Sequence, residues 1–115
     1  MPDPDRRGDG LARAATAVGD RWSLLLLREI ACGRVRFDQL ADALPISRKV
    51  LADRLRTLTG HRILERRPYR QRPLRHEYLL SPRGRALVPV LEDLHSWGAD
   101  WLTDHQPGTD TISTS

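Results

Sequence analysis

The chain has 115 residues and a net charge of +4, a size typical of one small domain. Its single cysteine excludes an intramolecular disulfide. Its longest aliphatic run, residues 24–27, is far shorter than the roughly 20 residues that span a membrane. The first ten residues are charged and rich in Pro and Gly, unlike a signal peptide, so we expect a soluble cytoplasmic protein.

The charge is distributed unevenly along the chain. Residues 47–85 contain twelve basic and three acidic residues, whereas the rest of the chain contains seven basic and twelve acidic ones. Genome composition can explain why eighteen of the nineteen basic residues are arginine, but it does not explain their clustering. The cluster therefore indicates a polyanionic partner, such as nucleic acid, for one face of the protein.

The first half of the domain is predicted to be helical. We expect disordered tails at residues 1–9 and 106–115 and one domain over residues 10–105. A short Ala-rich helix is predicted over residues 10–18, and a second, largely apolar helix over residues 21–32. Asp20 is suited to cap the second helix and Gly33 to end it. An apolar helix of this kind belongs in the centre of the fold.

The next segment has the pattern of a helix-turn-helix. A short extended piece at residues 35–37 leads into a predicted helix over 38–44, which Pro45 ends. Ser47 is a suitable N-cap for a helix over 48–59. Three leucines at positions 51, 55 and 58 give that helix one apolar stripe. Lys49 and Asp53 lie on the opposite side.

A change of periodicity follows. Residues 63–67 and 76–80 are predicted to be strands joined by a basic hairpin loop at 68–75. A last helix begins at Ser81-Pro82 and is expected to be kinked by Pro89. Two helices joined by a short turn and followed by a hairpin define a winged helix-turn-helix, which is mainly α with a small β-hairpin.

Several stretches together resemble the HxlR-type winged-helix regulators, which are related to the MarR group. The matching stretches are VGDRWSLLLLRE (18–29), RFDQL (36–40), ISRKVL (46–51), RLR (54–56), EYLLS (77–81), LVPVL (87–91) and WG (97–98), with Pro73 and Gly84. They occur in order and at the family's spacing over about residues 11–102.

The resemblance implies a homodimer built from the first and last helices, a recognition helix in the major groove, and a wing along the DNA backbone or minor groove. Three family features differ here, one of which is the turn before Ser47, which is about one residue shorter than in the family. The cysteine that many members carry before the first helix has no counterpart. The glycine near the end of the recognition helix falls at Arg62, whereas this chain has Gly60.

The predicted recognition helix, residues 47–59, carries the strongest candidate site. A helix N-terminus offers free N–H groups to a phosphate, and its first turns reach bases. Lysine can bind guanine, and aspartate can accept a hydrogen bond from cytosine. Ser47 could contact a phosphate, but capping is preferred, and a solvated polar face is the alternative for the others. The predicted DNA-contacting residues are Ser47, Arg48, Lys49, Asp53 and Arg54.

The hairpin supplies a second candidate surface. Arg70, Arg72 and Arg75 are predicted to contact phosphates or the minor groove, with a solvated loop as the alternative. Arg34 and Arg36 precede the helix-turn-helix and are weaker candidates for a backbone clamp. Pairing of these two arginines with Asp38 or Asp42 is nearly as well supported.

The apolar residues of the terminal helices are assigned to the dimer interface. They are Leu11, Leu87, Val90, Leu91, Leu94, Trp97, Gly98 and Trp101. A pocket floored by Trp97 and Trp101, which would bind a small-molecule effector, is the less favoured interpretation. Cys32 is expected to be a buried thiol rather than a redox switch. No metal-binding or catalytic motif was identified, so we expect no cofactor, no metal and no enzymatic activity.

Three functions compete at this stage. The favoured one is a homodimeric regulator of transcription that binds a palindromic or pseudo-palindromic site in double-stranded DNA. The alternative is a winged-helix module for protein–protein interaction, whose basic surface is incidental. An RNA-binding winged helix is the third. The sequence does not identify the operator, the target genes, the direction of regulation or any effector.

Overall fold

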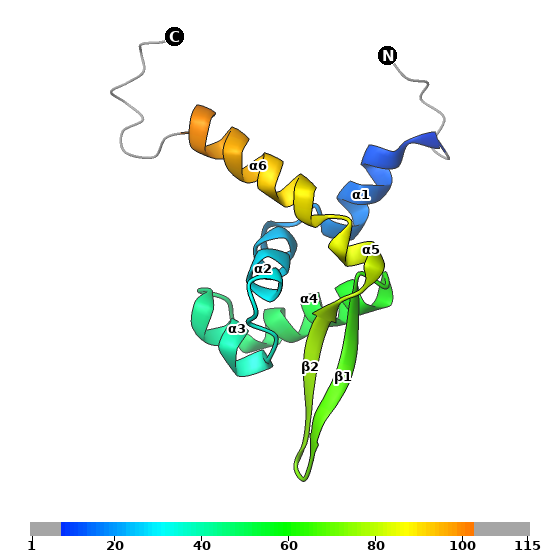
Figure 1. Cartoon of the computed structure of the whole chain (residues 1–115), viewed down its shortest axis with the longest axis vertical. Coiled ribbons are helices and arrows are strands. Elements are labelled where there is room, and N and C mark those ends of the chain that lie inside the picture. The colour runs from blue at the N-terminus through cyan, green and yellow to red at the C-terminus, as the bar shows by residue number, and fades with distance from the viewer. Residues whose placement is uncertain (1–7, 103–115) are drawn as a thin grey trace.

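The computed structural model describes residues 8–102, so residues 1–7 of the predicted N-terminal tail, residues 103–105 of the predicted domain and the predicted C-terminal tail lie outside the described residues. The described chain forms six helices and one antiparallel hairpin (Figure 1). In chain order these are α1 (Gly10–Val18), α2 (Arg21–Ala31), α3 (Phe37–Ala43), α4 (Arg48–Gly60), β1 (Leu64–Gln71), β2 (Leu74–Leu80), α5 (Pro82–Arg85) and α6 (Val88–Trp101). The winged helix-turn-helix that the sequence predicts is confirmed.

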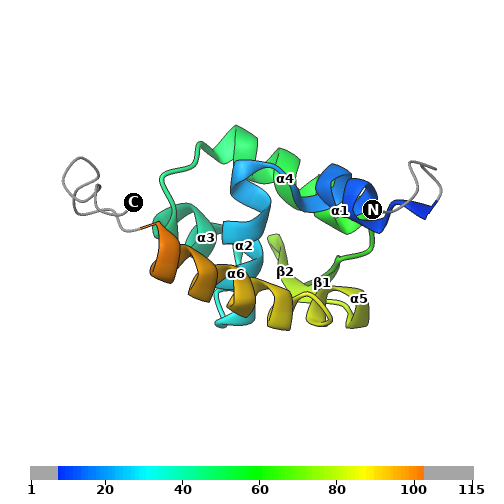
Figure 2. The same cartoon turned by 90° about the horizontal axis from the view of Figure 1, so that it is seen from above.

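Helix α2 occupies the centre of the fold, as its apolar sequence predicts. It contacts α3, α4, α6 and β2, and Figure 2 shows it between α4 and α6. Its buried face is formed by Ser23, Leu26, Leu27 and Ile30, which recur at helical spacing. Gly33 follows at a φ of 104°, a backbone conformation that favours glycine, and this turn ends the helix.

The helix-turn-helix is formed by α3 and α4. The leucine stripe of α4, Leu51, Leu55 and Leu58, is buried against the core. Ile46 fills the turn between the two helices and is also buried. The Ser47 Oγ accepts a hydrogen bond from the Val50 N–H over 3.1 Å, so Ser47 caps α4 as expected. The core therefore fixes which side of α4 faces outward.

The hairpin is longer than predicted, and most of the expected loop at residues 68–75 is strand. β1 extends to Gln71 and β2 begins at Leu74, so only Arg72 and Pro73 form the turn. Pro68 does not stop the pairing, because the register shifts between Pro68 and Arg70 and leaves Tyr69 as an extra residue. The basic residues therefore lie along a two-stranded arm that projects away from the helices (Figure 1).

The C-terminal segment is two helices, not the single kinked helix predicted. α5 ends at Arg85, and α6 begins at Val88 with Pro89 in its first turn. Proline has no N–H to donate to the preceding turn, so a helix breaks before it and restarts where that donor is not needed. Along the described chain, no helix is long and apolar enough to cross a membrane.

Cys32 is exposed, and the expectation that its thiol would be buried is wrong. It follows the last residue of α2 and lies two positions beyond Ile30, the last residue of the buried face. Two positions correspond to roughly 200° around a helix, which points the side chain away from the core. The position of Cys32 around the end of α2, rather than the apolar character of that helix, therefore determines its exposure.

Arg62 adopts an unusual backbone conformation after α4. Its φ is 60°, in the left-handed region that favours glycine, and it lies at the position where the resembled family carries glycine. His61 completes the C-cap, so α4 ends at Gly60 rather than two residues later.

Replacing Arg62 by glycine should therefore stabilise the protein. Relief of the left-handed strain outweighs the greater flexibility of glycine in the unfolded chain, and we expect a gain of roughly 0.5–1 kcal/mol in the free energy of unfolding. Urea denaturation of wild type and Arg62→Gly at equal protein concentration measures this difference. A loss of stability would mean that the arginine side chain has a stabilising contact.

Candidate nucleic-acid interface

The outward face of α4 presents the polar residues that the sequence singled out. Lys49 is 86% exposed, and its Nζ lies 3.8 Å from an Asp53 carboxylate oxygen one turn further on. The other Asp53 oxygen accepts a hydrogen bond from Arg56 over 2.9 Å. This hydrogen bond and the nearby Lys49 charge lower the pKa of Asp53, so its carboxyl stays ionised. The face therefore offers a highly exposed lysine that forms an ion pair with a carboxylate already bound by Arg56.

Arg48, the first residue of α4, is held by residues of α3. Its guanidinium lies 2.6 Å from the Asp38 carboxylate and 5.0 Å from the centre of the Phe37 ring. Both partners belong to the first turn of α3. Arg48 remains two-thirds exposed, so it is oriented without being buried.

Arg54 has an internal partner. Its guanidinium lies 3.7 Å from Asp20, whose carboxylate also accepts hydrogen bonds from Ser23 and from the Trp22 N–H at the start of α2. Partial burial alone would raise the pKa of Asp20, but these hydrogen bonds and the Arg54 charge outweigh it and lower that pKa. Arg54 thus joins α4 to the N-terminus of α2, a role that the sequence did not indicate.

Three arginines near the tip of the hairpin have no acidic partner among the described residues, whereas Arg67 lies 3.6 Å from Glu77. Arg70 and Arg75 face each other directly in the strand register, and Arg72 lies in the turn. All three are exposed, and none forms an ion pair with another described residue. Like charges placed opposite each other destabilise a strand pair. The end of the hairpin is therefore a concentrated, unneutralised cationic site.

Arg34 and Arg36 are paired, although not with Asp38 or Asp42 as considered from the sequence. Arg34 lies 3.2 Å from Glu29. Arg36 lies 3.3 Å from Glu77 of β2, and its guanidinium stacks 3.8 Å from the centre of the Tyr69 ring.

The partners Glu29, Glu77 and Tyr69 were missed. The sequence offers a signal only for Glu77, which is an acidic residue within an otherwise basic strand. The Tyr78 N–H also donates to the Val35 carbonyl over 2.7 Å. This backbone hydrogen bond and the Arg36–Glu77 ion pair both tie the hairpin to the segment before α3.

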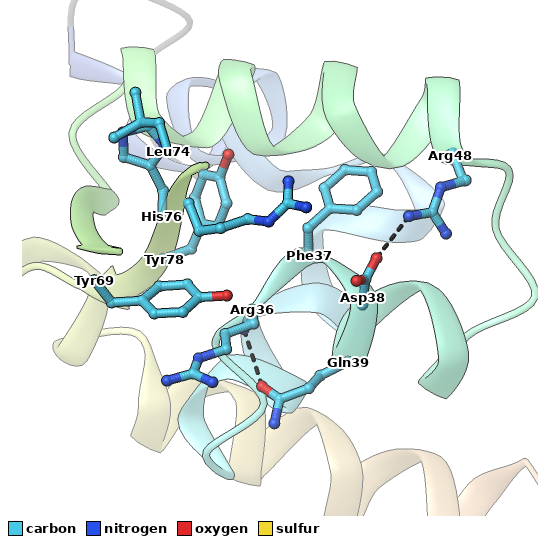
Figure 3. Close-up of a pocket in the computed structure, with 10 residues that line it drawn as sticks. Arg36, Phe37, Asp38, Gln39, Arg48, Tyr69, Leu74, His76 and Tyr78 are labelled. Carbon is cyan, nitrogen blue, oxygen red and sulfur yellow. Dashed lines mark hydrogen bonds and ion pairs between the residues drawn. The ribbon is translucent and has the colours of Figure 1, made fainter. Parts of the chain in front are cut away.

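These elements enclose a cleft of about 520 Å³ between α3, the first residue of α4 and the hairpin (Figure 3). Figure 3 shows Asp38 directed toward Arg48 on one side of the cleft, and Tyr69 and His76 on the strand side. The cleft is also lined by Arg36 and Arg75. The N-terminus of α4 and the basic hairpin therefore border one surface depression, whose lining combines three arginines with aromatic and polar side chains.

The predicted dimer residues divide into two groups. Leu87 and Leu91 are half-buried against the chain's own core, and Gly98 is also half-buried. The others are exposed, and they are Leu11 of α1 and Val90, Leu94, Trp97 and Trp101 of α6. The four α6 residues recur at intervals of four, three and four, so they form one stripe. Figure 1 shows α1 and α6 at the end of the molecule opposite the hairpin tip.

The geometry defines a winged helix-turn-helix protein with an exposed recognition-helix face and a basic wing. The profile of the HxlR-like helix-turn-helix family matches residues 17–106. This chain belongs to the HxlR-like helix-turn-helix family, which confirms the resemblance seen in the sequence.

Individual relatives support this assignment. The chain is 44% identical over 95 residues to an uncharacterized HTH-type transcriptional regulator of Mycobacterium tuberculosis, covering 83% of this chain and 60% of that protein. It is 32% identical over 100 residues to the HTH-type transcriptional regulator YodB of Bacillus subtilis, covering 86% of each. The chain therefore spans less than two thirds of the mycobacterial relative but most of YodB.

Solved structures share the fold. The reduced form of YodB from B. subtilis superposes with a TM-score of 0.72 at 28% identity, covering 92% of this chain and 100% of YodB. A regulator from Porphyromonas gingivalis W83 that is assigned to the MarR family gives a TM-score of 0.75 at 28% identity, covering 89% of this chain and 98% of that one. The relation to the MarR group is thus confirmed at the level of structure.

Proposed function

We propose that this protein is a homodimeric transcriptional regulator that binds a specific sequence in double-stranded DNA. The relatives named above are regulators of transcription, and the helix-turn-helix is a motif that reads DNA. In this proposal α4 enters the major groove, and the hairpin follows the backbone or the adjacent minor groove. No catalytic role, cofactor or metal is part of the proposal.

The observation that carries the proposal is the cationic end of the hairpin. Arg70 and Arg75 lie opposite each other, with Arg72 beside them in the turn, and no described acidic residue pairs with them. This arrangement costs stability in the free protein, because the charges repel. A phosphate backbone removes that repulsion and releases counterions when it binds. An interaction surface for an uncharged protein partner would give no reason for the cluster.

The outward face of α4 is suited to reading bases. Lys49 extends from its first turn and can bind guanine O6 or N7, and Asp53 beside it can accept a hydrogen bond from cytosine. Arg48 and the backbone N–H groups at the start of α4 are placed to meet phosphates. Ser47 and Arg54 already have structural partners, so we expect less direct DNA contact from them. Arg34 and Arg36 can approach the backbone only while sharing their charge with Glu29 and Glu77.

Dimerisation is proposed from the α6 stripe. A small monomer rarely leaves two tryptophans and two aliphatic residues exposed along one helix face, and Trp97 is 54% exposed here. A second copy of α6, together with α1, would cover this stripe. A largely apolar groove of about 470 Å³ lies next to it, between α2 and α6, with Leu24, Leu91 and Leu94 among its lining residues. An effector bound near the interface would occupy such a groove.

The decisive experiment is selection of bound fragments from a random DNA duplex library. Two half-sites related by a dyad and separated by about one helical turn are expected for a dimer. Light scattering of the same preparation should give twice the monomer mass of 13.1 kDa. Failure to enrich any sequence, together with binding that survives high salt, would favour the protein-interaction alternative.

Mutagenesis should separate the wing from the recognition helix. Arg72→Ala leaves one phosphate per wing without its cation, so the salt dependence of log K should become shallower by about 0.9 for each such phosphate, on selected and random duplexes alike. Lys49→Ala should cost roughly 1–3 kcal/mol on the selected duplex and much less on random duplex. Affinities of wild type and both variants at several salt concentrations measure this. If Arg72→Ala weakens only binding to the selected duplex, the wing reads sequence and this division is incorrect.

A further inference from the structure

The cleft between α3 and the hairpin contains one feature that does not fit a simple phosphate-binding surface. Of the described residues that line it, Arg36, Arg48 and Arg75 are cationic, and Asp38 is the single acidic one. Asp38 is 81% exposed, and Figure 3 shows its carboxylate directed toward Arg48. Its carboxylate therefore faces the solvent through which a DNA backbone would approach.

Asp38 also forms an ion pair with Arg48, the first residue of the recognition helix. The Arg48 guanidinium lies 2.6 Å from the Asp38 carboxylate and stacks on Phe37, the preceding residue of α3. Both charged side chains are largely exposed, and ion pairs of this kind contribute little to folding stability. The contact does have a second consequence, because Arg48 cannot give its full charge to a phosphate while Asp38 holds it.

We propose that Asp38 is a specificity-determining residue that weakens the binding of non-operator DNA. It does so by engaging Arg48 and by repelling any phosphate that enters the cleft. This inference rests on the proposed DNA-binding function. A phosphate must displace Asp38 from Arg48 before the arginine can bind it, and this exchange has a free-energy cost in every complex that depends on that phosphate contact.

The cost affects specific and non-specific complexes differently. On an operator, base contacts from α4 supply affinity that does not require this exchange, so Arg48 can stay paired with Asp38. On other sequences the protein is held only by phosphate contacts, and the unfavourable carboxylate removes part of that affinity. Discrimination therefore increases without any new contact to a base.

The test replaces Asp38 by asparagine, which keeps the shape and removes the charge. Affinities for a random-sequence duplex and for the duplex selected from the library are measured at several salt concentrations. We expect Asp38→Asn to bind the random duplex roughly 5- to 10-fold more tightly, since a like charge is removed from the path of the phosphates. The slope of log K against the logarithm of the salt concentration should steepen by about 0.9, because Arg48 becomes free to neutralise one more phosphate. Affinity for the selected duplex should rise less.

Asp42→Asn is the matched control. Asp42 lies on the same helix and is exposed, but it does not line the cleft. The control changes the net charge by the same amount. If both variants gain the same affinity for the random duplex, the effect comes from the overall charge of the protein, and the proposal is overturned. Thermal denaturation of both variants checks that the fold is retained.

A second variant tests the route through Arg48. In an Arg48→Gln background, Asp38→Asn should no longer steepen the salt dependence, because the residue it releases is missing. Steepening that persists in this background would overturn the role of Arg48. A wild-type protein that binds neither duplex would refute the proposed function itself. Normal binding with no difference between Asp38→Asn and Asp42→Asn would refute this inference alone.

Discussion

Gly84→Ala should lower the free energy of unfolding by about 2–4 kcal/mol. Gly84 is buried in α5, where the chain leaves the hairpin. A Cβ atom there would lie 2.3 Å from the Ile63 carbonyl oxygen and 3.2 Å from the Leu80 side chain. The Ile63 oxygen is a backbone atom just before β1, so no side-chain rotation can relieve this contact.

The surrounding hydrogen bonds explain why the backbone cannot shift cheaply. Ser81 is buried, and its Oγ donates to the Arg62 and Ile63 carbonyls and accepts the Gly84 N–H over 3.0 Å. Moving α5 to accommodate a methyl group would disrupt this capping arrangement and leave buried polar groups unpaired.

Urea denaturation at fixed protein concentration measures the Gly84 effect. Gly60→Ala is the control, because a Cβ atom at Gly60 meets nothing within 4 Å and alanine is favoured over glycine in a helix. The control should be neutral or slightly stabilising. Equal, small effects from both variants would show that α5 does not pack against Ile63 as closely as the structure indicates.

The helical part of the fold was predictable because its signals are local. The cap residues Asp20 and Ser47 and the leucine stripe of α4 each identify a helix boundary or a buried face within a few residues. These signals gave the boundaries of α1, α2 and α4 to within one residue. The outward position of Lys49 follows from the same periodicity.

The hairpin and the ion pairs were less predictable because they depend on residues far apart in the chain. Strand pairing extends through Pro68 to Gln71, although the sequence there is polar and does not alternate. The pairing of Arg36 with Glu77 joins positions 41 residues apart, and that of Arg48 with Asp38 crosses the helix-turn-helix. A sequence shows which arginines are available, but only the fold decides which of them are already neutralised.

Trp97→Asp should convert the proposed dimer into monomers. Trp97 lies in the middle of the exposed α6 stripe, between Leu94 and Trp101. A carboxylate there would have to be buried against its partner helix, and burying an unpaired charge is strongly unfavourable. Because Trp97 is half-exposed in the single chain, the fold of each monomer should be retained.

Loss of the dimer should have a large effect on DNA binding. Two linked recognition helices gain affinity because the second half-site is bound at a high effective concentration, a gain of roughly 10²- to 10⁴-fold. Trp97→Asp should lose most of that gain on the selected duplex, while each monomer keeps its own wing and α4. Light scattering and affinity measurements on a full site and on a single half-site separate the two effects.

Ala99→Asp provides the matched control. Ala99 is exposed on α6 and, at 100° per residue, lies on the side of the helix opposite the stripe. It adds the same charge to the same helix, so dimerisation and DNA affinity should change little. If Trp97→Asp remains dimeric, α6 is not the centre of the interface. If it becomes monomeric yet binds the full site as tightly as wild type, the two recognition helices do not act together.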